Sequence, residues 1–212
     1  PIRKRVTLRL LFHILLVIIV TDTAKGLEEV FAKLKGNDTP YVLIQLMGME
    51  DTMIAMYEEP EAVHDLVDFI TEAELDFAKN IMDRVPSVKA LLHHDDWGSQ
   101  KSLLIPPETW RELLLPATQR IAQHAKKLGI FFELHSDGMI KDIVPEIVEE
   151  IQPDAIQLMR INNIPELKKI TGRKVVYDVF VDIQSIDAQE NAGTLTEEIL
   201  RDQINREFTE QA

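Results

Sequence analysis

The stretch ALLHHDDWGSQ, residues 90–100, decides the fold, because an apolar run leads directly into two histidines and two aspartates. A second stretch, IFFELHSDG at residues 130–138, has the same order of apolar and titratable residues. Short continuous apolar runs are typical of strands that are buried on both faces of a parallel sheet. Titratable side chains are costly to bury, so we expect them where each strand ends. The two stretches therefore predict strands whose carboxyl ends carry polar side chains, which is where α/β sheets bind ligands.

Around these stretches the chain alternates between apolar runs and amphipathic segments with helical periodicity. Such alternation predicts an α/β fold in which helices cover a parallel sheet. No linker, low-complexity tract or repeat divides the sequence, so we expect one domain over residues 1–212. The expected strands lie at 39–48, 87–94, 130–135, 154–159 and 174–183, and the expected helices lie at 26–36, 60–85, 106–129, 143–151, 164–172 and 194–208.

The amino-acid composition indicates which classes of binding partner are expected. The formal net charge is −13, and an acidic surface repels phosphate backbones, so a nucleic-acid partner is not expected. The chain has no cysteine, which excludes disulfides and thiolate metal ligands and is compatible with the cytoplasm. An apolar run at residues 8–20 follows a basic start, but it is too short to cross a bilayer. We expect it to be a buried element of a cytoplasmic protein that has no membrane partner.

Polar side chains gather at the ends of four successive expected strands. One such cluster would be weak evidence, whereas four on consecutive strands indicate the rim of an active site. His93 and His94 are adjacent, so they point to opposite faces of a strand and at most one reaches that rim. Asp95 is also suited to capping a turn. The candidate site residues are His94, Asp96 and Gln100 after the first of these strands, His135 and Asp137 after the second, Gln157 and Arg160 after the third, and Asp182 after the fourth.

Five short motifs in the chain have a recognisable combination and order. They are DDWGSQ at 95–100, PP at 106–107, HSDG at 135–138, VDIQ at 181–184 and GTLTEE at 193–198. Together they resemble the uroporphyrinogen decarboxylase superfamily, and they are most similar to its branch of corrinoid-linked methyltransferases. The resemblance covers almost the whole chain from about residue 26 onward.

The resemblance implies a (β/α)8 TIM barrel that is longer than this chain. The first strands of the family are missing from the sequence or replaced by the run at 8–20, and the last strand is missing. We therefore expect an incomplete barrel, either a fragment or a truncated product. An open parallel sheet leaves two strand edges unpaired, so we expect something to cover them, for example a second copy of the chain in a homo-oligomer.

The resemblance also implies an enzyme that moves a methyl group between cobalamin and a small-molecule acceptor such as a thiol. In that branch the corrinoid is carried by a partner protein. By their positions in the motifs, Asp96, His135 and Asp137 are expected to be catalytic. The remaining candidates are expected to contact the substrate: His94, Gln100, Gln157, Arg160 and Asp182.

Zinc is a further feature of the methyltransferases that this chain resembles. Their zinc is held by a histidine, a cysteine two residues later and a second, more distant cysteine. Here His135 matches the histidine, but Asp137 occupies the next position and the chain has no cysteine. We therefore favour hydrogen-bonding roles for His135 and Asp137, while a zinc site formed by this pair with Asp96 or Asp182 stays open.

Two alternatives to a methyltransferase remain. A decarboxylase of porphyrin biosynthesis, like uroporphyrinogen decarboxylase itself, needs cations for a substrate that bears many carboxylates. Arg160 is the one obvious cation near the strand ends, which makes this match poorer. The second alternative is a non-catalytic fragment or tetrapyrrole-binding module, which would explain the absent cysteines and strands.

Overall fold

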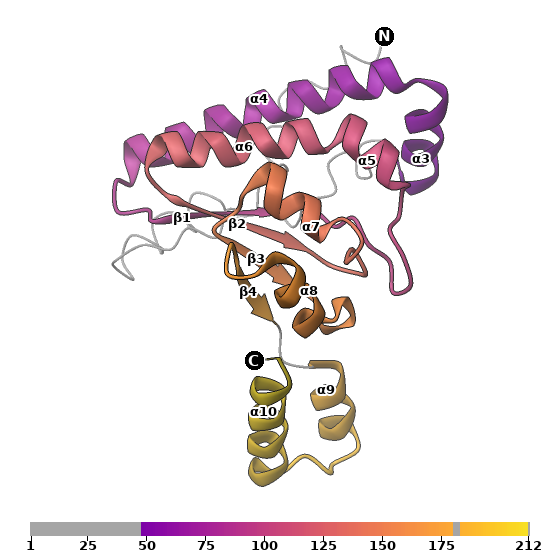
Figure 1. The fold of residues 1–212 in the computed structure, drawn as a ribbon, viewed down its shortest axis with the longest axis vertical. Helices are drawn as coiled ribbons and strands as arrows, with labels where there is room; N and C mark the ends of the chain where they lie inside the picture. Colours follow the sequence, from indigo (N-terminus) through magenta and orange to yellow (C-terminus); the bar gives the residue numbers. More distant parts are fainter. Residues whose placement is uncertain (1–47, 180–182, 212) are drawn as a thin grey trace.

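The computed structural model describes residues 48–179 and 183–211. The apolar run at 8–20, the expected helix at 26–36, the expected strand up to residue 47 and Asp182 therefore lie outside the described residues. The described part contains a four-stranded parallel sheet in the order β1-β2-β3-β4, and helices follow its strands (Figure 1). The strands are β1 (Ala90–His94), β2 (Phe131–Ser136), β3 (Ala155–Leu158) and β4 (Val176–Val179).

The spatial order of the strands is the same as their order in the sequence. Consecutive βα units of this kind build a (β/α)8 barrel, so the described sheet is an incomplete one of the expected α/β, TIM-barrel type. The α-helices are α3 (Met49–Glu58), α4 (Pro60–Arg84), α5 (Pro107–Leu113), α6 (Leu115–Leu128), α7 (Val144–Glu146), α8 (Ile164–Thr171), α9 (Ile183–Asn191) and α10 (Glu197–Gln211). A π-helical turn η3 (Ile147–Ile151) and a 3₁₀ turn η4 (Arg160–Asn162) complete the described elements.

The long helix α4 forms where the sequence predicts it, with Pro60 in its first turn. Its buried side chains recur every three or four residues from Val63 to Ala78, which is the periodicity of one helix face. It ends at Arg84 because the residue before a proline, here Val85, is disfavoured in the helical region. Helices α4 and α6 run side by side on one face of the sheet (Figure 1). Among the described residues, no helix has the length and apolar character needed to cross a membrane.

The sequence predicts a bend at Pro116 and a stop at Gly129, and the structure shows both. The expected helix divides into α5 and α6 at Leu114, and Pro116 lies in the first turn of α6, where its missing N–H costs nothing. At the other end Gly129 adopts a left-handed conformation with φ of 75°. Its N–H and that of Ile130 donate to the last carbonyls of α6, so the chain turns directly into β2.

Four elements differ from the sequence prediction. Helices α3 and α9 were not expected, and the expected strand at 174–183 ends at Val179 within the described residues, while Ile183 already begins α9. The run from Lys174 to Ile183 contains no glycine or proline, so the sequence has no signal for the change from strand to helix. The expected helix at 143–151 forms as a short α7 followed by the π-helical turn η3.

The two faces of the sheet have opposite characters. Side chains alternate along β2, so Phe132 and Leu134 are fully buried under the helices, whereas Glu133 and His135 point to the other face. On that second face Phe131 and Val176, at the starts of β2 and β4, are about two-thirds exposed within the described chain. The helix-covered face therefore holds the apolar core, and a cover for the open face by a second chain stays a prediction.

Adjacent phenylalanines of β2 provide a test of this arrangement. Phe132→Ala removes a ring that is completely buried, so it should lower the free energy of unfolding by about 3–5 kcal/mol. Phe131→Ala removes the same ring from a side chain that is 64% exposed, so its cost should be below about 1 kcal/mol. Urea unfolding monitored by circular dichroism measures both values. Equal losses for the two variants would contradict the assignment of faces.

Candidate active site at the carboxyl end of the sheet

Four polar side chains form a row across the sheet, one from each strand. The strand register pairs His94 with His135, His135 with Gln157 and Gln157 with Asp178. Side chains at the same level of adjacent parallel strands lie on the same face about 4.8 Å apart. We call these four residues the polar row. Its position near the carboxyl ends of the strands is where the sequence places an active-site rim.

Hydrogen bonds along the polar row fix the orientation of His135. Gln157 donates from its amide nitrogen Nε2 to Asp178 Oδ2 over 2.5 Å, because a carboxylate oxygen can only accept. Its amide oxygen therefore faces His135 and accepts from ring nitrogen Nδ1 over 2.8 Å. The proton of a neutral His135 ring is thus held on Nδ1. The second nitrogen, Nε2, is left to face the loops that follow the strands.

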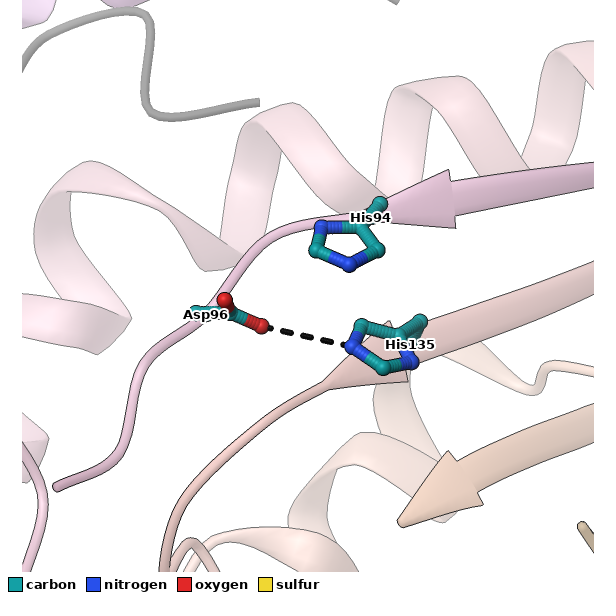
Figure 2. Close-up of side chains that lie close together, drawn as sticks. All are labelled: His94, Asp96 and His135. Atoms are coloured by element: carbon teal, nitrogen blue, oxygen red, sulfur yellow. Dashed lines mark ion pairs between the residues drawn. The ribbon is translucent and has the colours of Figure 1, made fainter. Parts of the chain in front are cut away.

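Two aspartates surround that second nitrogen. Asp96 Oδ1 and Asp137 Oδ1 each lie 3.5 Å from His135 Nε2, and Figure 2 shows the pair formed by Asp96 and His135. The Asp96 and His135 side chains are only 6% and 5% exposed, whereas that of Asp137 is 51% exposed. The backbone N–H of Asp137 also donates to Asp96 Oδ1 over 2.7 Å. The three residues expected to be catalytic therefore lie together, although their catalytic role remains a prediction.

The neighbouring histidines of β1 separate as the sequence predicts. The His94 ring stacks on the His135 ring, with centroids 3.9 Å apart and planes 14° apart (Figure 2). The His94 Nδ1 atom is buried and has no hydrogen-bond partner among the described residues. His93 points to the opposite face, where its Nδ1 lies 3.5 Å from Glu74 Oε2 of α4. One histidine thus joins the site and the other packs against a helix.

The pKa values of the two stacked rings move in opposite directions. Burial lowers the pKa of His135, but its interactions with Asp96, Gln157 and Asp137 outweigh that effect and raise the pKa above its ordinary value. The pKa of His94 is lowered, first by burial and then by the positive charge that His135 can carry. When one ring of the pair is protonated, it is therefore His135.

A second polar cluster lies behind the sheet, between β1 and α4. Asp95 Oδ2 accepts a hydrogen bond from Trp97 Nε1 over 2.7 Å, and burial raises the pKa of Asp95 to about 7. Burial lowers the pKa of His93 to about 4 and raises that of Glu74 well above its ordinary value. Near neutral pH, Glu74 and His93 are therefore uncharged, whereas Asp95 is close to half ionised. Asp95 holds the indole of Trp97 rather than serving the site directly.

The glycines of the two motifs bring the loops after β1 and β2 into backbone contact. A Cβ atom on Gly138 would lie 2.1 Å from the carbonyl carbon of Gly98, and one on Gly98 would lie 2.6 Å from the backbone nitrogen of Met139. Gly138 also has a φ of 80°, which side chains disfavour. Close to this contact, the N–H of Asp95 donates to the carbonyl of His135. Both motifs therefore need glycine to hold Asp96 against His135.

Two of the remaining candidates lie outside the polar row. Gln100 is exposed in the loop after β1, and Arg160 begins the turn η4; neither belongs to the polar row. Glu133 was missed, although it lies two residues before His135 and hence on the same face. Its pKa is raised by burial, by the charge of Asp178 and by a hydrogen bond to that residue. Asp178 lies on the last expected strand, and its place beside Gln157 depends on strand register, which is not readable from sequence.

The loop contact gives a prediction with a matched control. Gly138→Ala should lower the free energy of unfolding by about 3 kcal/mol or more, because a left-handed backbone and an overpacked contact each cost roughly 1–3 kcal/mol. Gly129→Ala has a similar φ but open space around its Cβ, so only the backbone penalty of about 1–2 kcal/mol applies. Equal costs in chemical unfolding would show that the two loops do not touch.

The back cluster predicts how stability changes with pH. Because the pKa of Glu74 is raised in the folded chain, the folded state keeps a proton that the unfolded state loses above about pH 4.5. The contribution of Glu74 to stability therefore falls as pH rises from 4.5. Glu74→Gln cannot ionise, so the variant should gain stability relative to the parent as pH rises from 4.5 to 8. Glu61→Gln, an exposed change on the same helix, is the control, and parallel stability curves for Glu74→Gln and the parent would refute this prediction.

The family model described as uroporphyrinogen decarboxylase (URO-D) matches residues 40–178, which is more than half of the chain. No curated protein matches. A solved structure titled methyltransferase from Methanosarcina mazei is similar, with a TM-score of 0.56 and 16% sequence identity. The match covers 70% of this chain and 45% of that protein, so the chain spans less than half its length and the likeness concerns the fold. On the match to the family model, the chain belongs to the uroporphyrinogen decarboxylase family.

Proposed function

We propose that this chain is part of a methyltransferase-like enzyme that passes a methyl group from a corrinoid protein to a small acceptor. The observation that carries the proposal is the meeting of the DDWGSQ and HSDG motifs around His135, at the carboxyl end of the sheet. Family membership and the likeness in fold to a methyltransferase support it. The corrinoid would come from a partner protein, as the resemblance implies.

The charge of the site favours methyl transfer over decarboxylation of a porphyrinogen. Four acidic residues lie on the polar row or beside it: Asp96, Asp137, Asp178 and Glu133. The polar row itself contains no arginine or lysine. A substrate that bears many carboxylates would be repelled by such a site, whereas a small neutral thiol would not.

The chemistry requires the acceptor to lose a proton as it gains the methyl group. A corrinoid, when bound, would supply an electrophilic methyl group, and the electron pair of the broken bond would stay with the corrinoid. The residues of this chain hold the acceptor beside His135 and accept the proton that the acceptor loses. Asp137 is the most exposed member of the catalytic set, so it is the residue from which the proton can pass to water.

The zinc site of the resembling methyltransferases does not fit this chain. That site needs two thiolates, and the chain has no cysteine. Asp137 occupies the position of the first cysteine, but its side chain is half exposed. No step proposed above therefore passes through a thiolate-bound zinc ion.

Methyl transfer from methylcobalamin to a panel of small thiols tests the proposal, using the natural protein that contains this chain. Asp137→Asn should reduce the rate by about 100-fold, because general acid–base groups contribute factors of this order. Asp142→Asn is the matched control, since Asp142 is exposed and lies five residues further along the chain. The proposal fails if no thiol is methylated, or if uroporphyrinogen is decarboxylated instead.

A non-catalytic module that binds a tetrapyrrole is the second candidate. It is favoured by the open face of the sheet, where Phe131 and Val176 expose apolar surface within the described chain. Titration with hydroxocobalamin, followed by absorbance, separates the two candidates. Binding without any methyl transfer would support the module, and both binding and transfer would support the enzyme.

A further inference from the structure

We propose that His94, Asp96 and His135 form a binding site for a divalent transition-metal ion. One nitrogen or oxygen atom from each of these residues lies within 4.8 Å of those of the other two. Figure 2 shows the three side chains converging from β1, from the loop that follows it, and from β2. The site differs from the set left open by the sequence, which combined His135 and Asp137 with Asp96 or Asp182, in that His94 takes the place of Asp137. It is proposed independently of the reaction, because metal binding can be measured without turnover.

The distances around His135 match those between two ligands of one ion. His135 Nε2 and Asp96 Oδ1 are 3.5 Å apart. Ligands that bind an ion at about 2.0–2.2 Å in a tetrahedron are separated by roughly 3.3–3.6 Å. An ion can therefore lie between these two atoms without a change in the backbone. Asp137 Oδ1, also 3.5 Å from His135 Nε2, borders the same space.

Two of the three ligands are already oriented by their neighbours. Gln157 holds the Nδ1 proton of His135 and is itself held by Asp178, so the lone pair of a neutral His135 lies on Nε2. Metal-binding histidines commonly use their other ring nitrogen in this way, and such outer hydrogen bonds raise metal affinity. Asp96 accepts a hydrogen bond from the backbone of Asp137, which fixes its carboxylate.

The third ligand must move, and the structure shows which ring is able to. A ring nitrogen binds a metal in the plane of its ring, and two rings stacked 14° from parallel cannot both direct their lone pairs at one ion. His135 is held by Gln157, whereas His94 Nδ1 has no hydrogen-bond partner among the described residues. Metal binding should therefore rotate the His94 ring and break the stacking with His135.

The donor atoms indicate the class of metal. Two imidazoles and one carboxylate, without thiolate, suit Zn²⁺, Co²⁺ or Fe²⁺, and they leave coordination positions open for water or a substrate. The same three ligands would bind Mg²⁺ or Ca²⁺ poorly, because these ions prefer oxygen. The proposed site therefore binds its metal through nitrogen and oxygen ligands, where a thiolate site uses sulfur.

Titration of the chelator-treated natural protein with Zn²⁺ by calorimetry tests the site. We expect one equivalent to bind, and His94→Ala or Asp96→Ala to weaken affinity by at least about 100-fold. Gln157→Leu, which removes the hydrogen bonds to His135 Nδ1 and Asp178 but no proposed ligand, should weaken it by about 10- to 100-fold. His64→Ala is the control, since this histidine is half exposed on α4. Circular dichroism confirms that each variant folds; His94→Gln replaces His94→Ala, and Asp96→Asn replaces Asp96→Ala, where the alanine variant does not fold.

Substitution with Co²⁺ gives a readout of the ligand set. The visible bands of the bound ion should appear without a thiolate charge-transfer band, and they should be lost in His94→Ala but not in His64→Ala. Three outcomes would overturn the proposal: no stoichiometric Zn²⁺ binding, binding that survives loss of His94, or binding that depends on Asp137 alone. None of these outcomes bears on methyl transfer, so the two proposals can fail separately.

Discussion

The backbone contact between the loops after β1 and β2 is the constraint on which the site depends. Gly98 and Gly138 approach so closely that neither position has room for a Cβ atom. This approach lets Asp96 accept from the Asp137 N–H, and it lets the N–H of Trp97 donate to Ser136 Oγ. The carboxylate of one motif thereby reaches the imidazole of the other. Without the two glycines, DDWGSQ and HSDG would carry the right residues at the wrong separation.

Alternation along β1 and the loop that follows it separates two pairs of adjacent titratable residues. His94 and Asp96 face the site, whereas His93 and Asp95 lie on the side of Glu74 in α4. The negative charge of Asp96 helps to raise the pKa of Asp95, after the larger effect of burial. Asp95 therefore binds its proton more tightly, and the charge of the pair falls on the residue that contacts His135. Because Glu74 and His93 are uncharged near neutral pH, they add no charge behind the site.

The sequence predicts the elements of this fold better than it predicts their contacts. Continuous apolar runs locate β1 to β3, and Pro116 and Gly129 locate the divisions of a helical stretch, because each signal is local. The beginning of α9 at Ile183, the last residue of an expected strand, was missed since no breaker precedes it. The row that joins His94, His135, Gln157 and Asp178 was not predicted, because register between strands depends on packing, which a single sequence does not show. His135 and Asp96 could be predicted because they directly follow apolar runs.

A single substitution can change a side chain in a loop of the site without moving the side chains that the strands position. The positions of His94, His135, Gln157 and Asp178 depend on the register of four strands, and a side-chain change in a loop does not alter that register. Asp137 follows the end of β2 and is half exposed, so its side chain can be exchanged at little cost to packing. An aspartate where the resembling methyltransferases have cysteine therefore removes a thiolate but leaves the polar row intact. Any metal held here must then use ligands that the strands and the buried Asp96 provide, which is why the proposed ligand set shifts toward β1.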